Sequence, residues 1–343
     1  MEILPNSWQT GPISDKDLKP VHDRPIQTIS IRNDLAVTGA ADHSLRVWDL
    51  VKGTHIRHLY NKNFGHKEWV TCCSFLQDQR IISGGMDGIL CLWDRKAVRC
   101  DNLIEHTGSI SALMVDNNDI AISASYDKSL IVWDLYRLKP LINLPSTSPV
   151  TCFVWNNSLV VSGERDGKVL FWDINTGKNF YTMSCHSGAI HKLCFSVDGG
   201  TNNFLASCGK DGKVSVCDLR DNNCVFNQQL HRGAVNVVAG TLSNTLITAS
   251  TDGVIHVLDM FMGFQERLSM NANSAILCGE VLQNLFVVGC SDGNILVYNL
   301  DSGETCFGFG ADNAGGVNCI GISPNKRKLL TGGDSGIPLL LSF

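Results

Sequence analysis

The sequence predicts an all-β protein built from eight copies of one repeating unit. Three observations carry this prediction: a segment of about thirteen residues recurs without gaps, its apolar residues alternate, and no long apolar pattern has the helical period. Each copy has an apolar run, a polar turn and a second apolar run. The turn residues lie 39 to 45 positions apart and are Asp42, Asp87, Asp127, Asp166, Asp211, Asp252, Asp292 and Ser335.

Each copy is interpreted as a β-hairpin. Asp-Gly stands at the turn in five copies, and this dipeptide suits a two-residue turn with positive φ. After the turn, apolar residues alternate with polar ones, as at Val214 and Val216 or at Ile255 and Val257. This period of two is typical of a half-buried strand.

A further strand precedes each hairpin and another follows it. The preceding strand begins with an apolar residue four positions after a polar one, in the pairs His22/Ile26, His66/Val70, His106/Ile110, Ser146/Val150, His186/Ile190, His231/Val235, Asn271/Ala275 and Asn313/Val317. Five of the ten histidines stand in this one column. A fourth strand fits after the hairpin, for example at 139–144 or 178–185, so each unit holds four short strands.

This pattern resembles the WD-repeat family across essentially the whole chain. Four intact Trp-Asp pairs, at 48–49, 93–94, 133–134 and 172–173, carry the resemblance together with the spaced histidines and the Asp turns. The resemblance implies a closed β-propeller, in which each repeat forms a four-stranded blade. We therefore expect residues 1–343 to form a single propeller domain of eight blades, with seven blades as the alternative because that number is commoner in the family.

The His, Ser or Thr, Asp and Trp of one repeat can form a chain of hydrogen bonds within a blade. The first three predicted tetrads are His22, Thr38, Asp42 and Trp48; His66, Ser83, Asp87 and Trp93; and His106, Ser123, Asp127 and Trp133. A His, Asp and Ser set also fits a catalytic triad. Because the set recurs from blade to blade, we interpret it as structural and predict no catalytic, cofactor-binding or metal-binding residues.

The second half departs from the pattern. Cys217, Leu258, Tyr298 and Leu341 replace the Trp, Asn271 and Asn313 replace the His, and Ser335 replaces the last Asp. The last copy also ends at the third strand of its blade. We expect residues 1–21 to close the ring, with about 11–21 in the place of the missing outer strand, because an open edge would invite aggregation.

Composition narrows the class of protein. The chain is 44% apolar and 18% charged, with 28 basic against 33 acidic residues, which excludes a disordered chain and disfavours direct binding of nucleic acid. No apolar run is long enough to span a membrane, and the first residues lack a secretory signal. The fourteen cysteines contain no Cys-x-x-Cys pair, so we expect free thiols and a cytoplasmic or nuclear protein.

The resemblance implies a partner-binding face on the side of the turns. Three positions of each repeat should reach it: the residue before the turn Asp and the two residues that flank the first apolar residue of the inner strand. In repeats two to five these positions supply aromatic, apolar and basic side chains, which are Trp69, Met86, Tyr126, Arg165, His191 and Lys210. Aromatic and Arg side chains commonly anchor interfaces, and this mixture suits an acidic or phosphorylated peptide with an apolar neighbour.

Two functions follow from these observations. The first is a non-enzymatic scaffold or adaptor that presents a propeller face to protein or peptide partners. The alternative is a substrate-recognition or modified-peptide-recognition subunit of a multiprotein complex such as a ubiquitin ligase. The segments 93–96 (WDRK) and 217–220 (CDLR) loosely resemble an element of ligase substrate receptors. No phosphate-binding loop or nucleophile motif appears outside the repeats, so we predict no enzyme activity.

Overall fold

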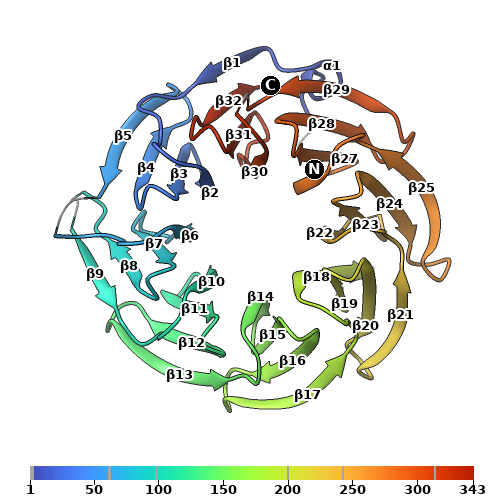
Figure 1. The fold of residues 1–343 in the computed structure, drawn as a ribbon, viewed down its shortest axis with the longest axis horizontal. Helices are drawn as coiled ribbons and strands as arrows, with labels where there is room; N and C mark the ends of the chain where they lie inside the picture. The colour runs from blue at the N-terminus through green and yellow to red at the C-terminus, as the bar shows by residue number, and fades with distance from the viewer. Residues whose placement is uncertain (1–3, 61–62, 97–98, 199–200, 242, 313) are drawn as a thin grey trace.

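The chain forms a ring of eight antiparallel sheets in a computed structural model (Figure 1). The structure describes residues 4–60, 63–96, 99–198, 201–241, 243–312 and 314–343. Each sheet has four strands. In seven of the sheets the first strand in the chain lies nearest the centre of the ring, and the eighth sheet has its N-terminal strand on the outside. The predicted eight-bladed propeller is therefore confirmed, and the seven-bladed alternative is wrong.

The strands follow one another outward within each blade. Blades one to four consist of β2 (Ile26–Arg32), β3 (Leu35–Ala40), β4 (Leu45–Asp49), β5 (Thr54–Leu59); β6 (Val70–Phe75), β7 (Ile81–Gly85), β8 (Leu90–Trp93), β9 (Cys100–Leu103); β10 (Ile110–Val115), β11 (Ile120–Ser125), β12 (Ser129–Asp134), β13 (Lys139–Pro145); and β14 (Val150–Asn156), β15 (Leu159–Glu164), β16 (Lys168–Asp173), β17 (Lys178–Ser184). The outer strands predicted at 139–144 and 178–185 match β13 and β17 closely.

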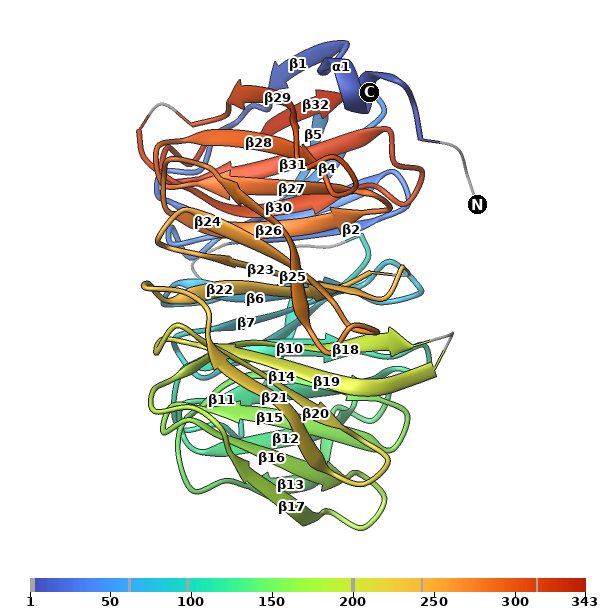
Figure 2. The ribbon, with the colours of Figure 1, turned by 90° about the vertical axis from the view of Figure 1, so that its right-hand side faces the viewer.

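The second half of the ring repeats this order. Blades five to seven consist of β18 (Ile190–Asp198), β19 (Thr201–Gly209), β20 (Lys213–Asp218), β21 (Asn223–Gln229); β22 (Val235–Gly240), β23 (Thr245–Ser250), β24 (Val254–Asp259), β25 (Gln265–Asn271); and β26 (Ile276–Leu282), β27 (Leu285–Cys290), β28 (Asn294–Asn299), β29 (Thr305–Gly310). Blade eight contributes β30 (Val317–Ile322), β31 (Lys328–Gly333) and β32 (Leu339–Ser342). In the side view, these blades stack against their neighbours (Figure 2).

The outer strand of the eighth sheet comes from the other end of the chain. Strand β1 (Ser14–Asp17) pairs with β32, from Ser14 opposite Ser342 to Asp17 opposite Leu339 (Figure 1). Just before it, the short helix α1 (Ser7–Thr10) places the Trp8 ring on the ring of Phe343, with centroids 3.8 Å apart. The Trp8 Nε1–H also donates to the carbonyl of Lys326 at 2.7 Å.

The hydrophobic core is divided among the seams between blades. One cluster joins Val37 and Val47 of blade one to Val70 and Phe75 of blade two, and each of the other seven clusters of the described residues likewise combines residues of two adjacent blades. Leu18, which follows β1, packs with Trp48 and Leu340 in the seam between blades eight and one. Because each blade buries apolar surface against both of its neighbours, apolar contacts run from blade to blade around the whole ring.

The turn between the second and third strands differs from the predicted two-residue turn. In blade two, Gly88 N donates to the carbonyl of Gly85, and only Gly88, with φ of 74°, has positive φ. Gly85 N also donates to the carbonyl of Ile89 at 3.3 Å, so three residues, Met86–Gly88, lie between this bonded pair, with one left-handed residue at the end. Asp87 stabilises it, because its Oδ1 accepts from the backbone N–H of Ile89 at 3.1 Å.

The cysteines pack as small apolar side chains. All fourteen are free thiols, and thirteen of them are buried or half-buried. Cys224 on β21 is the one exposed cysteine of the described residues.

Candidate partner-binding face

The His, Ser, Asp and Trp of one repeat meet at the inner side of the turn. In blade three, the indole N–H of Trp133 donates to Ser123 Oγ at 2.8 Å. Ser123 Oγ lies 2.7 Å from His106 Nε2, and His106 Nδ1 lies 2.8 Å from Asp127 Oδ2. The three bonds form one chain: the Trp133 indole donates to Ser123 Oγ, the Ser123 hydroxyl donates to His106 Nε2, and His106 Nδ1–H donates to the Asp127 carboxylate.

The same arrangement recurs in the first two blades. His22 bonds Asp42 and Thr38 at 3.0 and 2.8 Å, and the indole of Trp48 donates to Thr38. His66 bonds Asp87 and Ser83 at 3.2 and 2.8 Å, and the indole of Trp93 donates to Ser83. The structure thus brings together each of the three tetrads predicted from the sequence.

The tetrads fix the backbone of the turn side. In blade three, Asp127 Oδ2 also accepts from the backbone N–H of Thr107 at 2.9 Å, so the turn is held to the connection that precedes β10. Burial lowers the pKa of His106, although the charge of Asp127 acts the other way. Burial alone would raise the pKa of Asp127, but hydrogen bonds from Ser129, Thr107 and His106 lower it. A neutral imidazole beside an ionised carboxylate is therefore the stable state.

The tetrad weakens toward the C-terminus. Blades five and six keep the His, Asp and hydroxyl, with His186 bonded to Asp211 and His231 to Asp252. In blade seven, Asn271 instead accepts from the backbone N–H of Asn273. The predicted substitute in blade eight, Asn313, lies outside the described residues. Asp312 fills that role, since its Oδ2 accepts from Ser335 N and Oγ.

Each residue before a turn Asp is held beside the start of its inner strand. Met86 N donates to the carbonyl of Trp69, and Arg165 N to that of Pro149, both at 2.9 Å. In blade seven the corresponding bond runs from Ser291 to Ala275, and the buried apolar residue is Ile276. The predicted register there, with Ala275 as the apolar residue, is wrong by one position, because the connection after Asn271 is one residue longer.

The six predicted partner-binding side chains are all exposed on the side of the turns. Trp69, Met86 and Tyr126 expose 40%, 44% and 45% of their surface. We call Trp69, Met86, Tyr126, Arg165, His191 and Lys210 the docking patch. Within the described residues no ion pair neutralises Arg165 or Lys210. The patch therefore presents large apolar groups on blades two and three and cationic groups on blades four and five.

The residue that follows the first apolar residue of each inner strand serves mainly to join neighbouring blades. Five of its side chains donate to a carbonyl of the next inner strand: Thr71 to Ile110 and Ser111 to Val150 at 2.7 Å, Thr151 to Ile190 at 2.6 Å, Asn236 to Ile276 at 2.8 Å, and Asn318 to Ile26 at 3.3 Å. His191 likewise bonds Asn236 Oδ1 through Nδ1 at 3.1 Å. Sequence reasoning missed this role, although the run of short polar residues at one register position could have indicated it.

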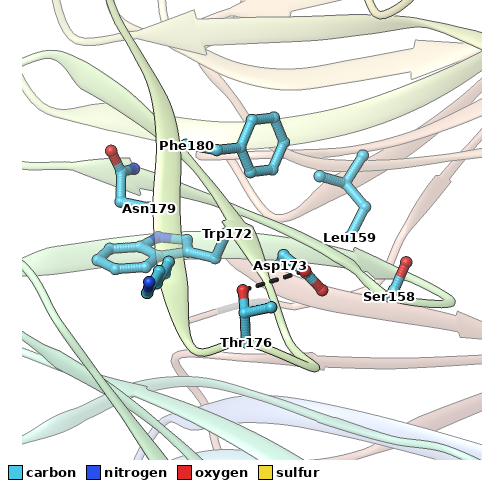
Figure 3. Close-up of a pocket in the computed structure, with 8 residues that line it drawn as sticks. Ser158, Leu159, Trp172, Asp173, Thr176, Asn179 and Phe180 are labelled. Atoms are coloured by element: carbon cyan, nitrogen blue, oxygen red, sulfur yellow. Dashed lines mark hydrogen bonds between the residues drawn. The ribbon is translucent and has the colours of Figure 1, made fainter.

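A pocket of about 570 Å³ lies at the opposite end of blade four (Figure 3). It is lined by Trp172 and Asp173 of β16, by Leu159 at the start of β15 and by Phe180 of β17. Both carboxylate oxygens of Asp173 are occupied by its own turn, since Oδ1 accepts from Asn175 N and Oδ2 from Thr176 Oγ1. The pocket therefore lies among the outer three strands of blade four and their connections, apart from the docking patch.

The comparison with protein families agrees with this geometry. The family model described as WD domain, G-beta repeat (WD40) matches residues 19–49, 57–94, 98–134, 138–173 and 177–218, which together make up more than half of the chain. The chain belongs to the WD40 family. The matched ranges run from blade one to β20 of blade five, and blades six to eight have the same four-stranded antiparallel order.

Curated relatives match parts of this WD40 chain. They include autophagy-related protein 16 of Arabidopsis thaliana, 28% identical over 50% of the chain and 33% of the relative; mitochondrial division protein 1 of Eremothecium gossypii, 26% identical over 47% and 27%; and a p21-activated protein kinase-interacting protein 1-like protein of Danio rerio, 26% identical over 47% and 41%. The chain spans less than half the length of these relatives.

A solved structure matches nearly the whole WD40 ring. The computationally designed Ika8 protein is 26% identical and superposes with a TM-score of 0.82 over 95% of this chain and 98% of the designed one. In the part of the chain that the structure describes, the one helix, α1, has four residues, and no helix there is long and apolar enough to cross a bilayer.

Proposed function

We propose that the protein is a non-enzymatic scaffold whose docking patch binds peptide segments of partner proteins. The observation that carries the proposal is the exposure of Trp69, Met86 and Tyr126 next to the unpaired cations Arg165 and Lys210. Interface anchors are enriched in Trp, Tyr and Arg, and an Arg fork can hold a carboxylate or a phosphate with two bonds. The preferred ligand is a segment with an acidic or phosphorylated residue beside an apolar one.

The backbone under the docking patch is held before any partner arrives. The bonds from Met86 to Trp69, Tyr126 to Ser109, Arg165 to Pro149 and Lys210 to Ala189 fix the turns at 2.8 to 2.9 Å. Ser109 Oγ also donates to the carbonyl of Met86 at 3.1 Å and so links blades two and three. Such preorganisation lowers the entropy cost of binding. A peptide partner would therefore meet a surface whose backbone is already in place.

The relatives and the thiols support the cellular setting of the proposal. The Danio rerio relative is named for interaction with a protein kinase, which fits a role in protein interaction. The fourteen free thiols favour a reducing compartment, so we place the protein in the cytoplasm or nucleus. The near balance of basic and acidic residues gives no footprint for direct binding of nucleic acid.

Recovery of partners from native lysate tests the docking patch. The variant Trp69→Ala, Tyr126→Ala, Arg165→Ala should lose most partners at an unchanged melting temperature, because all three side chains are exposed. The matched control changes exposed apolar residues of the opposite face, Tyr136→Ala, Phe261→Ala and Met262→Ala, whose side chains are 85%, 73% and 62% exposed. Loss of the same partners in the control, with retention in the first variant, would overturn the proposal.

The same experiment separates the alternative function. Arg95 and Lys96, in the segment that loosely resembles a ligase-receptor element, are exposed at the end of blade two opposite the turns. Co-recovery of ubiquitin-ligase subunits that depends on Arg95, as tested with Arg95→Ala, would select a substrate-recognition subunit. A stable set of partners without ligase subunits would select the scaffold.

A further inference from the structure

In blade four, a small side chain and a large side chain have changed places at two neighbouring positions of the repeat. Elsewhere the residue two positions before the turn Asp is small, because the side chain of the His column fills the space beside it. A Cβ atom on Gly85 of blade two would lie 2.6 Å from His66 Nδ1, and one on Gly209 of blade five would lie 3.0 Å from His186 Nδ1. Blade four has Ser146 at the His position and Glu164 at the position two residues before the turn Asp. The Glu164 side chain thus stands where an imidazole stands in the five blades that have a His at this position.

The Glu164 carboxyl is buried and only partly hydrogen-bonded. The residue has no exposed surface, and its Oε2 accepts from Thr147 Oγ1 at 3.3 Å. Among the described residues, Glu164 Oε1 and Ser146 Oγ have no hydrogen-bond partner. Leaving a buried carboxylate oxygen without a donor is costly, so this carboxyl gains from a bound proton.

The charges around Glu164 also favour the proton. Asp166 lies two residues away on the same turn and pairs with Lys168 Nζ at 2.7 Å. The connection that covers the carboxyl, Ser146–Pro149, carries no charged side chain. The two neighbouring blades touch the site through carbonyls: that of Lys128 accepts from Ser146 N, and that of His186 packs on Gly167.

These surroundings shift the carboxyl toward its neutral form. Burial raises the pKa of Glu164 to about 7, and the negative charge of Asp166 adds to the rise. The hydroxyl of Thr147 and the charge of Lys168 act the other way.

We propose that Glu164 and Ser146 form a proton-binding site that controls how firmly the Arg165 turn is held to the Ser146–Pro149 connection. With the proton bound, the carboxyl is neutral and the connection stays closed, with Arg165 N bonded to the carbonyl of Pro149 at 2.9 Å. When the proton leaves, an unpaired carboxylate remains in the interior beside Asp166. Opening of the connection then admits water to the carboxylate, and the Arg165 N–H becomes accessible.

Hydrogen–deuterium exchange on the free protein tests this site without any partner, so its outcome is independent of the proposed function. After correction for the intrinsic pH dependence of exchange, the segment that contains Arg165 should exchange about tenfold faster at pH 8 than at pH 6, as expected for opening linked to one ionisation near neutrality. The equivalent segment around Tyr126, whose N–H bonds the carbonyl of Ser109 at 2.9 Å, is the internal reference and should not change.

Three variants assign the effect. Glu164→Gln cannot ionise and should exchange equally at both pH values, whereas Glu304→Gln, on an exposed turn, should behave as the wild type. If Glu164→Gln folds poorly, the double variant S146H/E164G rebuilds the arrangement of blades two and five and should fold without the tenfold change. The proposal is overturned if the Arg165 and Tyr126 segments show the same pH dependence, or if the tenfold change persists without Glu164.

Discussion

Removal of one hydroxyl, in Ser123→Ala, tests how the tetrad stabilises a blade. Ser123 has no exposed surface, accepts from the Trp133 indole at 2.8 Å and donates to His106 Nε2 at 2.7 Å. Alanine removes one oxygen and keeps the rest of the side chain. The change therefore leaves a buried donor and a buried acceptor unpaired and creates almost no cavity.

The expected loss follows from counting those two groups. A buried polar group without a partner costs about 1 to 3 kcal/mol. Two such groups predict a loss of about 2 to 6 kcal/mol, a large part of the roughly 5 to 15 kcal/mol that stabilises a typical domain. Blade four offers the matched case, because Ser162 bonds the Trp172 indole at 3.0 Å and has Ser146 in place of a histidine. Ser162→Ala should lose about half as much.

Urea unfolding followed by tryptophan fluorescence and by circular dichroism measures both variants. The two probes should give coincident transitions, so that the free energies can be compared. We predict the order wild type, Ser162→Ala, Ser123→Ala, from most to least stable. Equal losses in the two variants, or a loss below about 0.5 kcal/mol in Ser123→Ala, would refute the view that the hydrogen-bonded chain stabilises the blade.

Three further predictions concern the whole ring. Burial lowers the pKa of four tetrad histidines, which are His22, His106, His186 and His231. Their contribution to the free energy of unfolding is therefore fully present above pH 6.5 and is lost as the pH falls through their pKa values in the folded protein. The melting temperature should drop between pH 6.5 and 5, and a constant melting temperature would contradict this. Deletion of residues 1–21 should lower the melting temperature by many degrees and reduce solubility, because it removes β1 from blade eight, Trp8 from the seam between blades seven and eight, and Leu18 from the seam between blades eight and one. An unchanged melting curve would show that this segment does not close the ring. In native protein, a thiol reagent such as dithionitrobenzoate should modify one cysteine quickly, and Cys224→Ser should remove that fast phase; several fast thiols would contradict the described burial.

The parts of the fold that repeat could be predicted from the sequence. Eight gapless copies, the period-two alternation and the His column predict four strands per unit, because each copy must satisfy the same spacing. The geometry of a single turn could not be predicted in the same way. Asp-Gly suits a two-residue turn, yet the Asp carboxylate bonds the backbone after the turn and selects the longer connection with one left-handed glycine.

The sequence predicts which residues of the docking patch are exposed on the side of the turns, but it does not predict the hydrogen bonds around them. The exposed residues before each turn Asp follow from the repeat, as Tyr126 and Arg165 do. The inter-blade bonds of Thr71 and Asn318 depend on carbonyls of a neighbouring blade, which no pattern within one repeat contains. The packing of Glu164 into an imidazole's place likewise depends on contact between two columns, so it became evident only in three dimensions.

Selection of peptides from a displayed library tests the central claim most directly. Peptides in unphosphorylated and phosphorylated form are selected on the wild-type protein, and the dissociation constants of the selected peptides are then measured. We predict enrichment of an acidic or phosphorylated residue beside an apolar one, with binding weakened at least tenfold by Arg165→Ala and by Tyr126→Ala, and unchanged by Tyr136→Ala on the opposite face. Selected peptides without an anionic residue, or equal binding by Arg165→Ala and the wild type, would contradict the docking patch.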